Sequence, residues 1–201
     1  MKIATTSVLV MAACASVASA DITFTFLETG GNVTMNSSGT FDTTGLPVVG
    51  PFGWGSTGLE ENGNHDIMGG TDVGAIDISF AFNAGTDYSQ WASANGPWTT
   101  SSFPWTVNAV KKGFATYVRY PNTNAQVPGL GVEQADLNGA LWTPDQSWTW
   151  FGGTFASLGM NVGIYTVSDA VTGESITFHI VPAPASLALL GLSGLAIRRR
   201  R

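Results

Sequence analysis

The sequence ITFTFL at residues 22–27 alternates apolar and polar side chains, and SITFHI at residues 175–180 repeats the pattern near the other end of the chain. Alternation with a period of two predicts strands that bury one side and expose the other. Residues 75–82, AIDISFAF, show the same period. Such similar first and last strands are able to lie side by side in one sheet, although the pattern alone does not show that they pair.

Composition favours short strands joined by tight turns. The chain has 25 glycines and is 11% aromatic, whereas charged residues make up only 11%; such a composition favours strands and turns. Further strands are predicted at residues 33–35, 114–120, 147–155 and 163–167. Residues 47–74 are predicted to form a long loop with one or two short strands, and residues 83–105 a second loop. We therefore predict an all-β fold, an antiparallel β-sandwich or jelly roll, flanked by an N-terminal signal helix and a C-terminal hydrophobic helix.

The first twenty residues have the three parts of a secretory signal peptide. Lys2 gives a basic start, and residues 3–18 are apolar and small. Ala18 and Ala20 fit the A-x-A cleavage rule, which places the mature start at Asp21. The sequence thus predicts a signal peptide at 1–20 and a β domain at 21–180.

Cys14, the only cysteine, lies inside this signal segment. Cleavage after Ala20 leaves a chain without thiols, so disulfides, thiol catalysis and cysteine-ligated zinc are excluded. A lipid anchor on Cys14 is the alternative, but Met11 is a poor residue three positions before it.

Residues 181–201 have three parts that together form a membrane address. A proline motif comes first, formed by Val181, Pro182, Ala183 and Pro184. Residues 185–197 are uncharged and apolar; at about 1.5 Å per residue they cover roughly 20 Å as a helix, short of the ~30 Å hydrocarbon core. The chain then ends on a basic cluster that stops translocation, formed by Arg198, Arg199, Arg200 and Arg201.

This layout resembles the PEP-CTERM sorting tail of Gram-negative bacteria, in which a Pro-Glu-Pro-type motif precedes a short transmembrane stretch and a basic end. Pro182 and Pro184 match the two prolines, Val181 matches the residue before them, and Ala183 replaces the usual glutamate. The resemblance implies that exosortase, a membrane-embedded cysteine protease, reads and removes the tail. An unprocessed tail anchor is the alternative, although a plain anchor is normally longer.

Parts of the domain, residues 31–46 and 154–180, also resemble members of this family. They are glycine and strand positions, so they relate to fold rather than chemistry. The resemblance implies an exported surface protein linked to extracellular polysaccharide or biofilm, with no general enzymatic activity.

The middle of the chain is strongly acidic. All fourteen Asp and Glu lie there, whereas only Lys111, Lys112 and Arg119 of the eight basic residues do. An acidic surface repels phosphate backbones, so we predict no nucleic-acid partner. The three basic residues fall within nine positions and form either a local positive spot or a solvated strand edge.

His65 and His179 are the only histidines. His179 is predicted to be an exposed strand residue. His65 lies in the oxygen-rich stretch EENGNHD at residues 60–66, and calcium prefers six to eight oxygen ligands. Because the EF-hand spacing is absent, we predict a solvated acidic loop and assign no metal site, with calcium as the minor alternative.

No motif assigns catalytic residues. A Ser-His-Asp triad lacks the nucleophile elbow that would support it, and phosphate-cradling motifs are missing. The acidic residues are too scattered to nominate a glycosidase pair. We therefore predict a protein that is not an enzyme, with an unrecognised hydrolase as an alternative.

The seven tryptophans fall mostly in loops or near strand ends. Trp148 and Trp150 share one side of a strand, so the pair is either core or a platform for stacking on sugars. This pair is the candidate glycan-binding site, and a carbohydrate-binding module is the second functional hypothesis.

The first hypothesis is a non-enzymatic, exported protein that is structural or adhesive in the envelope or extracellular matrix. Its predicted partners are the secretion machinery, signal peptidase, an exosortase-type protease, the membrane through its tail, and extracellular polysaccharide. It is predicted to be anchored transiently in the inner membrane before it reaches the surface.

Overall fold

A computed structural model describes residues 21–71, 76–92, 94–108, 112–123 and 125–182. These residues are mostly strand, so the predicted all-β class is confirmed. The helices predicted for the signal peptide and the tail fall on residues 1–20 and 183–201, outside the described residues. Within the described parts, no helix is long and apolar enough to cross a membrane.

The described elements, in chain order, are β1 (Asp21–Thr29), β2 (Asn32–Gly39), β3 (Phe41–Asp42), β4 (Val48–Val49), β5 (Gly58–Glu61), β6 (His65–Gly69), β7 (Ile78–Ala81), α1 (Ser89–Ala92), β8 (Thr106–Val107), β9 (Phe114–Arg119), β10 (Gln126–Val132), the 3-10 turn η1 (Gln134–Asp136), β11 (Leu141–Trp142), β12 (Ser147–Phe151), β13 (Gly163–Ser168) and β14 (Ser175–Val181).

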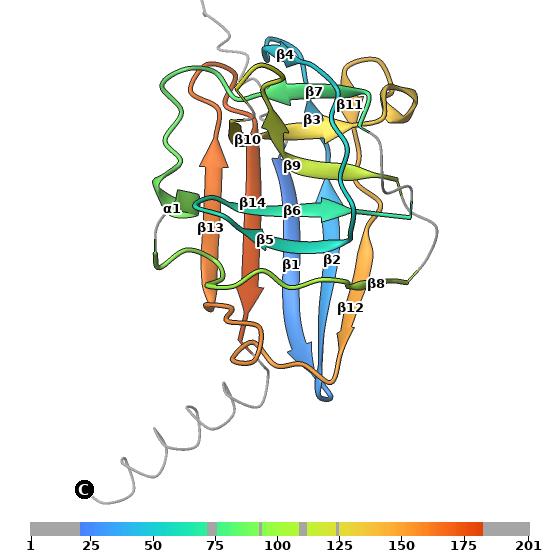
Figure 1. Ribbon diagram of the computed structural model, residues 1–201, viewed down its shortest axis with the longest axis vertical. Coiled ribbons are helices and arrows are strands. Elements are labelled where there is room, and N and C mark those ends of the chain that lie inside the picture. Colours follow the sequence, from blue (N-terminus) through green and yellow to red (C-terminus); the bar gives the residue numbers. More distant parts are fainter. Residues whose placement is uncertain (1–20, 72–75, 93, 109–111, 124, 183–201) are drawn as a thin grey trace, which may run out of the picture.

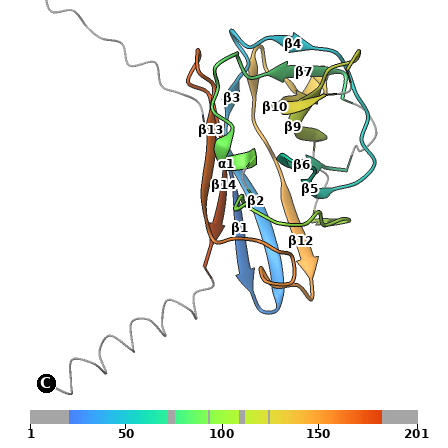
Figure 2. The same cartoon turned by 60° about the vertical axis from the view of Figure 1, so that its left-hand side comes forward.

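Two six-stranded sheets form the domain. Sheet I has the strand order β13-β14-β1-β2-β12-β8, and sheet II has the order β4-β7-β10-β9-β6-β5. A third, small sheet joins β11 to β3. Strands of sheet II run across those of sheet I (Figure 1), and the turned view shows the sheets as two layers (Figure 2).

The first and last strands are neighbours in sheet I, and their pairing is parallel. Asp21 lies opposite Ser175, and the register continues to Leu27 opposite Val181. The other strand pairs described are antiparallel, so the predicted antiparallel architecture needs this correction. A parallel pair requires a long crossover connection, and here the rest of the domain provides it.

Aromatic side chains join the two sheets. Phe24 of β1 stacks on Phe114 of β9 with ring centroids 5.3 Å apart. Trp98 packs against Phe178 of β14 at 5.0 Å. The alternation predicted at residues 22–27 therefore puts Ile22, Phe24 and Phe26 in the core, where all three are fully buried.

Side chains cover the open edge of sheet I. At the edge strand β13, the Thr166 N–H donates to Oε1 of Gln90 at 2.9 Å, and the Tyr165 carbonyl accepts a hydrogen bond from Nε1 of Trp91 at 3.3 Å. Both partners come from α1. Exposed strand edges invite pairing with other chains, so α1 protects this edge from such pairing.

Asp169 ties the turn before β14 to a distant loop. Its carboxylate accepts hydrogen bonds from the backbone N–H groups of Asn83, Val171 and Thr172, at 2.5, 3.0 and 2.7 Å respectively, and from the Thr172 hydroxyl at 3.0 Å. Burial raises the pKa of Asp169, but the hydrogen bonds outweigh it and lower the pKa to about 2.

Several elements differ from the expected pattern. Residues 47–74, predicted to hold one or two short strands, contain three, β4, β5 and β6, and the predicted loop at 83–105 contains α1. The last strand, β14, includes Val181. The folded domain therefore extends one residue beyond the expected boundary at 180 and into the predicted sorting motif.

Candidate functional site

A pocket of about 380 Å³ opens beside the β5–β6 hairpin. Its walls come from the hairpin, the end of α1 and the segment that leads to Thr99. The lining residues are Glu61, Gly63, His65, Ala92, Ala94, Trp98 and Thr99. A pocket of this size suits a small ligand, and a few polar groups on its wall would set the chemistry of binding.

His65, the first residue of β6, is 3% exposed. Its Nδ1 contacts the Trp91 carbonyl oxygen, which can only accept, so Nδ1 carries the proton. Nε2 of the neutral ring is then an acceptor. The ring also meets Trp98 edge to face, with centroids 5.7 Å apart. Gly96 fits against the ring, since a Cβ at this position would lie 2.4 Å from Cε1.

Glu61 lies opposite His65 in the hairpin. Its backbone N–H donates to the Ser101 hydroxyl at 2.8 Å, and its Oε1 accepts from the Gly63 N–H at 3.2 Å. Thr99 donates its hydroxyl to the Gly159 carbonyl at 3.3 Å. The side chains of Glu61 and Thr99 thus present oxygen acceptors at the pocket that His65 lines.

The pocket gathers a histidine, a carboxylate and a hydroxyl, which the hydrolase alternative requires. A triad needs the carboxylate on Nδ1 of the histidine and the nucleophile on Nε2. In this structure Nδ1 of His65 faces a backbone carbonyl, and the Thr99 hydroxyl donates elsewhere. The geometry described is therefore not that of a triad, and the assignment of no catalytic residue stays a prediction.

Glu60 and Asp66 form the adjacent cross-strand pair of the hairpin. Successive residues of a strand point to opposite faces, so this pair lies on the side away from the pocket. Asp66 is fully buried, and neither of its carboxylate oxygens has a hydrogen-bond partner. Burial first, and the negative charge of Glu60 second, raise the pKa of Asp66 well above its usual value.

These positions correct the prediction of a solvated acidic loop at residues 60–66. Only the turn at 62–64 lies between strands, because the apolar side chains of β6 draw its neighbours into the core. Across the described ranges, no group of three or more His, Cys, Asp or Glu side chains is placed to hold a metal ion.

Asp66 makes stability depend on pH. A raised pKa means that the folded state holds a proton that the unfolded chain releases near pH 4, so stability falls as pH rises from about 4 towards the folded pKa. We expect Asp66→Asn to remove this fall in stability with pH. The urea concentration at the midpoint of unfolding, measured at several values between pH 4 and pH 8, tests this. Asp77→Asn is the matched control and should keep the wild-type slope. Equal slopes in wild type and Asp66→Asn would contradict the prediction.

The candidate glycan platform is not a free surface. Trp148 is fully buried and packs on Phe114 at 5.7 Å, because its side of β12 faces sheet II. Trp150 is partly buried and meets Trp105 at 5.9 Å. Trp148 is therefore a core residue and offers no face for stacking on a sugar, whereas for the partly buried Trp150 a role in glycan binding stays a prediction. The other five tryptophans are also buried: Trp54, Trp91, Trp98, Trp105 and Trp142.

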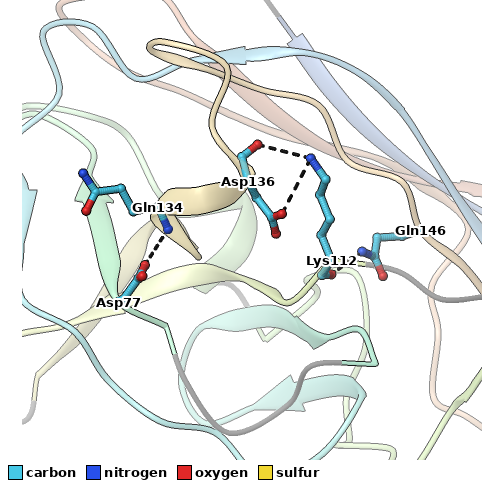
Figure 3. A network of polar contacts seen from close by, with 5 residues as sticks. All are labelled: Asp77, Lys112, Gln134, Asp136 and Gln146. Atoms are coloured by element: carbon cyan, nitrogen blue, oxygen red, sulfur yellow. Dashed lines mark hydrogen bonds and ion pairs between the residues drawn. The ribbon is translucent and has the colours of Figure 1, made fainter.

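Polar contacts around Lys112 fasten the start of β9 to its neighbours (Figure 3). Lys112 donates to the Asp136 carbonyl at 3.2 Å and lies 3.8 Å from the Asp136 carboxylate. Gln146 donates to the Lys112 carbonyl at 2.5 Å and accepts from Nε1 of Trp148 at 2.9 Å. Asp77 accepts from the Gln134 N–H at 2.5 Å, so η1 is held on both sides (Figure 3).

This pairing bears on the predicted positive spot. Lys112 is engaged with Asp136, and Lys111 lies outside the described residues. Arg119 is at the end of β9. Because the positive spot would need Lys111, its formation stays a prediction.

The sorting and processing residues lie at the ends of the domain. Asp21 is the first residue of β1, and its carboxylate accepts from the Ser175 hydroxyl at 2.6 Å. Val181 ends β14 opposite Leu27, and Pro182 follows it. The other predicted signal residues lie outside the described residues: Ala18, Ala20, Ala183, Pro184, Arg198, Arg199, Arg200 and Arg201.

His179 is half-buried on β14, between Thr25 and Ile164. It belongs to the face of sheet I that points away from sheet II, as the alternation predicts.

No protein-family model, curated protein or solved structure matches the chain. The fold, the pocket and the sequence signals are therefore the grounds for a functional proposal.

Proposed function

We propose that the chain is an exported β-sandwich protein that is sorted through its C-terminal tail and acts, without enzymatic activity, in the cell envelope or extracellular matrix. Signal peptidase removes residues 1–20, the short apolar segment holds the chain in the inner membrane, and an exosortase-type protease reads the motif at 181–184. The β domain then has a structural or adhesive role, with extracellular polysaccharide as its surroundings.

One observation carries this proposal. Among the described residues, the first strand begins at Asp21, the residue after the predicted cleavage site, and the last strand ends at Val181, the first residue of the predicted motif. The described strands thus lie between the predicted signal cleavage site and the two prolines of the predicted motif. Removal of both ends would leave the paired strands β1 and β14 whole.

Two further features fit this role. The described edge strand β13 is covered by α1, which suits a protein that must stay soluble at high local concentration. The domain also needs no disulfide, since the only cysteine is Cys14 in the predicted signal peptide.

The test is mass spectrometry of both ends of the protein isolated from its host. We expect a mature chain that begins at Asp21 and ends between Pro182 and Pro184. A variant with Pro182 and Pro184 both changed to Ala should keep residues 185–201, while still losing residues 1–20. A wild-type chain that still ends in Arg201 would overturn sorting and leave a retained anchor.

A further inference from the structure

We propose that the pocket beside His65 binds a small ligand through a primary ammonium group. The ligand site is formed by Glu61, His65 and Thr99. This inference goes beyond export and sorting, and it holds whether or not the tail is removed.

His65 supplies the first observation. Its Nε2 makes no hydrogen bond within the described residues, although His65 is only 3% exposed. His65 lines the pocket, and its Nε2 is not one of the fully enclosed atoms without a partner. Nearly all buried polar atoms in proteins have a partner, and an acceptor without one calls for a donor from outside.

Glu61 supplies the second observation. Its carboxylate has no Lys or Arg within ion-pair distance among the described residues. Its Oε1 receives one backbone N–H, and no described hydrogen bond uses Oε2. A half-buried carboxylate at a pocket wall attracts a cation more strongly than one in bulk water, because the local dielectric constant is lower.

The polar groups on the pocket wall are therefore acceptors. Nε2 of His65, the Glu61 carboxylate and the lone pairs of the Thr99 hydroxyl all accept, since the Thr99 proton is given to Gly159. An ammonium group has three donors and one positive charge, which match three acceptors and one negative charge. The acidic domain around the pocket, with fourteen Asp and Glu, adds attraction for cations.

The cavity limits the size of the ligand. About 380 Å³ admits an amino sugar or the end of a lysine side chain, and Ala92, Ala94 and Trp98 give the wall some apolar surface. Both ligands carry the same ammonium group. The shared chemistry is what the pocket recognises, and the probes below distinguish the two sources.

The experiment titrates the full chain, purified in detergent at pH 8. The probes are glucosamine, N-acetylglucosamine and Nα-acetyl-lysine amide. Binding is measured by calorimetry and by the shift of the NMR signals of the His65 ring. We expect glucosamine, the lysine amide or both to bind and shift the His65 signals, and N-acetylglucosamine to bind at least about tenfold more weakly. The tighter of the two amines identifies the source.

Variants locate the site. Glu61→Gln keeps the acceptor for Gly63 but removes the charge, and it should weaken amine binding by about tenfold or more. Asp77→Asn removes an acidic charge away from the pocket and should leave binding unchanged. Equal binding of glucosamine and N-acetylglucosamine to the wild type, an unchanged affinity in a folded Glu61→Gln variant, or no binding of either amine would each overturn the proposal.

Discussion

Trp91→Ala is expected to destabilise the domain by about 3–5 kcal/mol, the usual cost of deleting a buried aromatic side chain from a core. Trp91 is fully buried and stacks on Phe178 with ring centroids 4.4 Å apart and planes 18° apart. Its Nε1 also pairs with the Tyr165 carbonyl of the edge strand β13. The substitution therefore opens a cavity and uncovers a strand edge together. Guanidinium unfolding followed by circular dichroism measures the loss.

Two variants make this expectation specific. Trp91→Phe keeps an aromatic stack but removes the Nε1 donor, so it should lose less than Trp91→Ala. Phe151→Ala, at a side chain that is 66% exposed, should change stability by no more than about 0.5 kcal/mol. A loss below about 1 kcal/mol for Trp91→Ala would mean that α1 does not support the core.

Asp169→Ala is expected to cost roughly 2–4 kcal/mol at pH 7. Several charge-assisted hydrogen bonds disappear at once, and the N–H groups of Asn83, Val171 and Thr172 lose their acceptor. Because Asp169 holds the loop at Asn83 next to the turn before β14, both segments should loosen. Urea unfolding gives the magnitude, and hydrogen exchange of these three amides shows where it acts.

The pH dependence of this effect has a definite sign. The folded pKa of Asp169 is lowered to about 2, whereas an unfolded aspartate titrates near 4. Asp169 therefore stabilises the fold above about pH 4, and its contribution is lost as pH falls from about 4 through about 2. The difference in free energy of unfolding between wild type and Asp169→Ala should decrease as the pH falls over that range. Asp87→Ala is the control, because this carboxylate is exposed and accepts hydrogen bonds from the neighbouring Ser89, so its loss should have a small effect.

Alternation of apolar and polar residues predicts a strand only where one face of that strand meets water. Strands β1 and β14 fall at positions predicted from alternation, because the residues on their outer face are only partly buried and mostly polar. Strand β6, HDIMG, is buried along its whole length, so it has no alternation to detect. The sequence alone therefore does not locate this strand within the loop predicted at 47–74.

Strand β10, QVPGLGV, contains a proline and two glycines, which are signals of a turn. In the fold, Gly129 lies so close to β7 that a Cβ would be 2.4 Å from the Phe80 carbonyl oxygen. The register also shifts between Pro128 and Gly131. These residues reflect close packing inside a sheet, and a single sequence does not distinguish that need from a loop.

For the candidate site too, the sequence predicted local features but not which distant residues meet. The sequence shows the oxygen-rich stretch at 60–66 but predicts a solvated loop there. Glu61 and His65 meet in one pocket only because the hairpin register pairs them and because Thr99 arrives from a segment far along the chain. Likewise, the sequence leaves a tryptophan at a predicted loop or strand end open as a core or a surface residue, whereas six of the seven are buried in the structure.

The sequence by itself determined the all-β class, the strands with one wet face, and the processing signals predicted at both ends, because these depend on local composition and period. The tertiary structure alone decided that β1 and β14 pair in parallel, that Asp66 is buried without a partner, and that His65 and Glu61 share a pocket. Each of these depends on which distant segments pack together. That choice is made by burial of apolar area over the whole domain, so no local stretch of sequence records it.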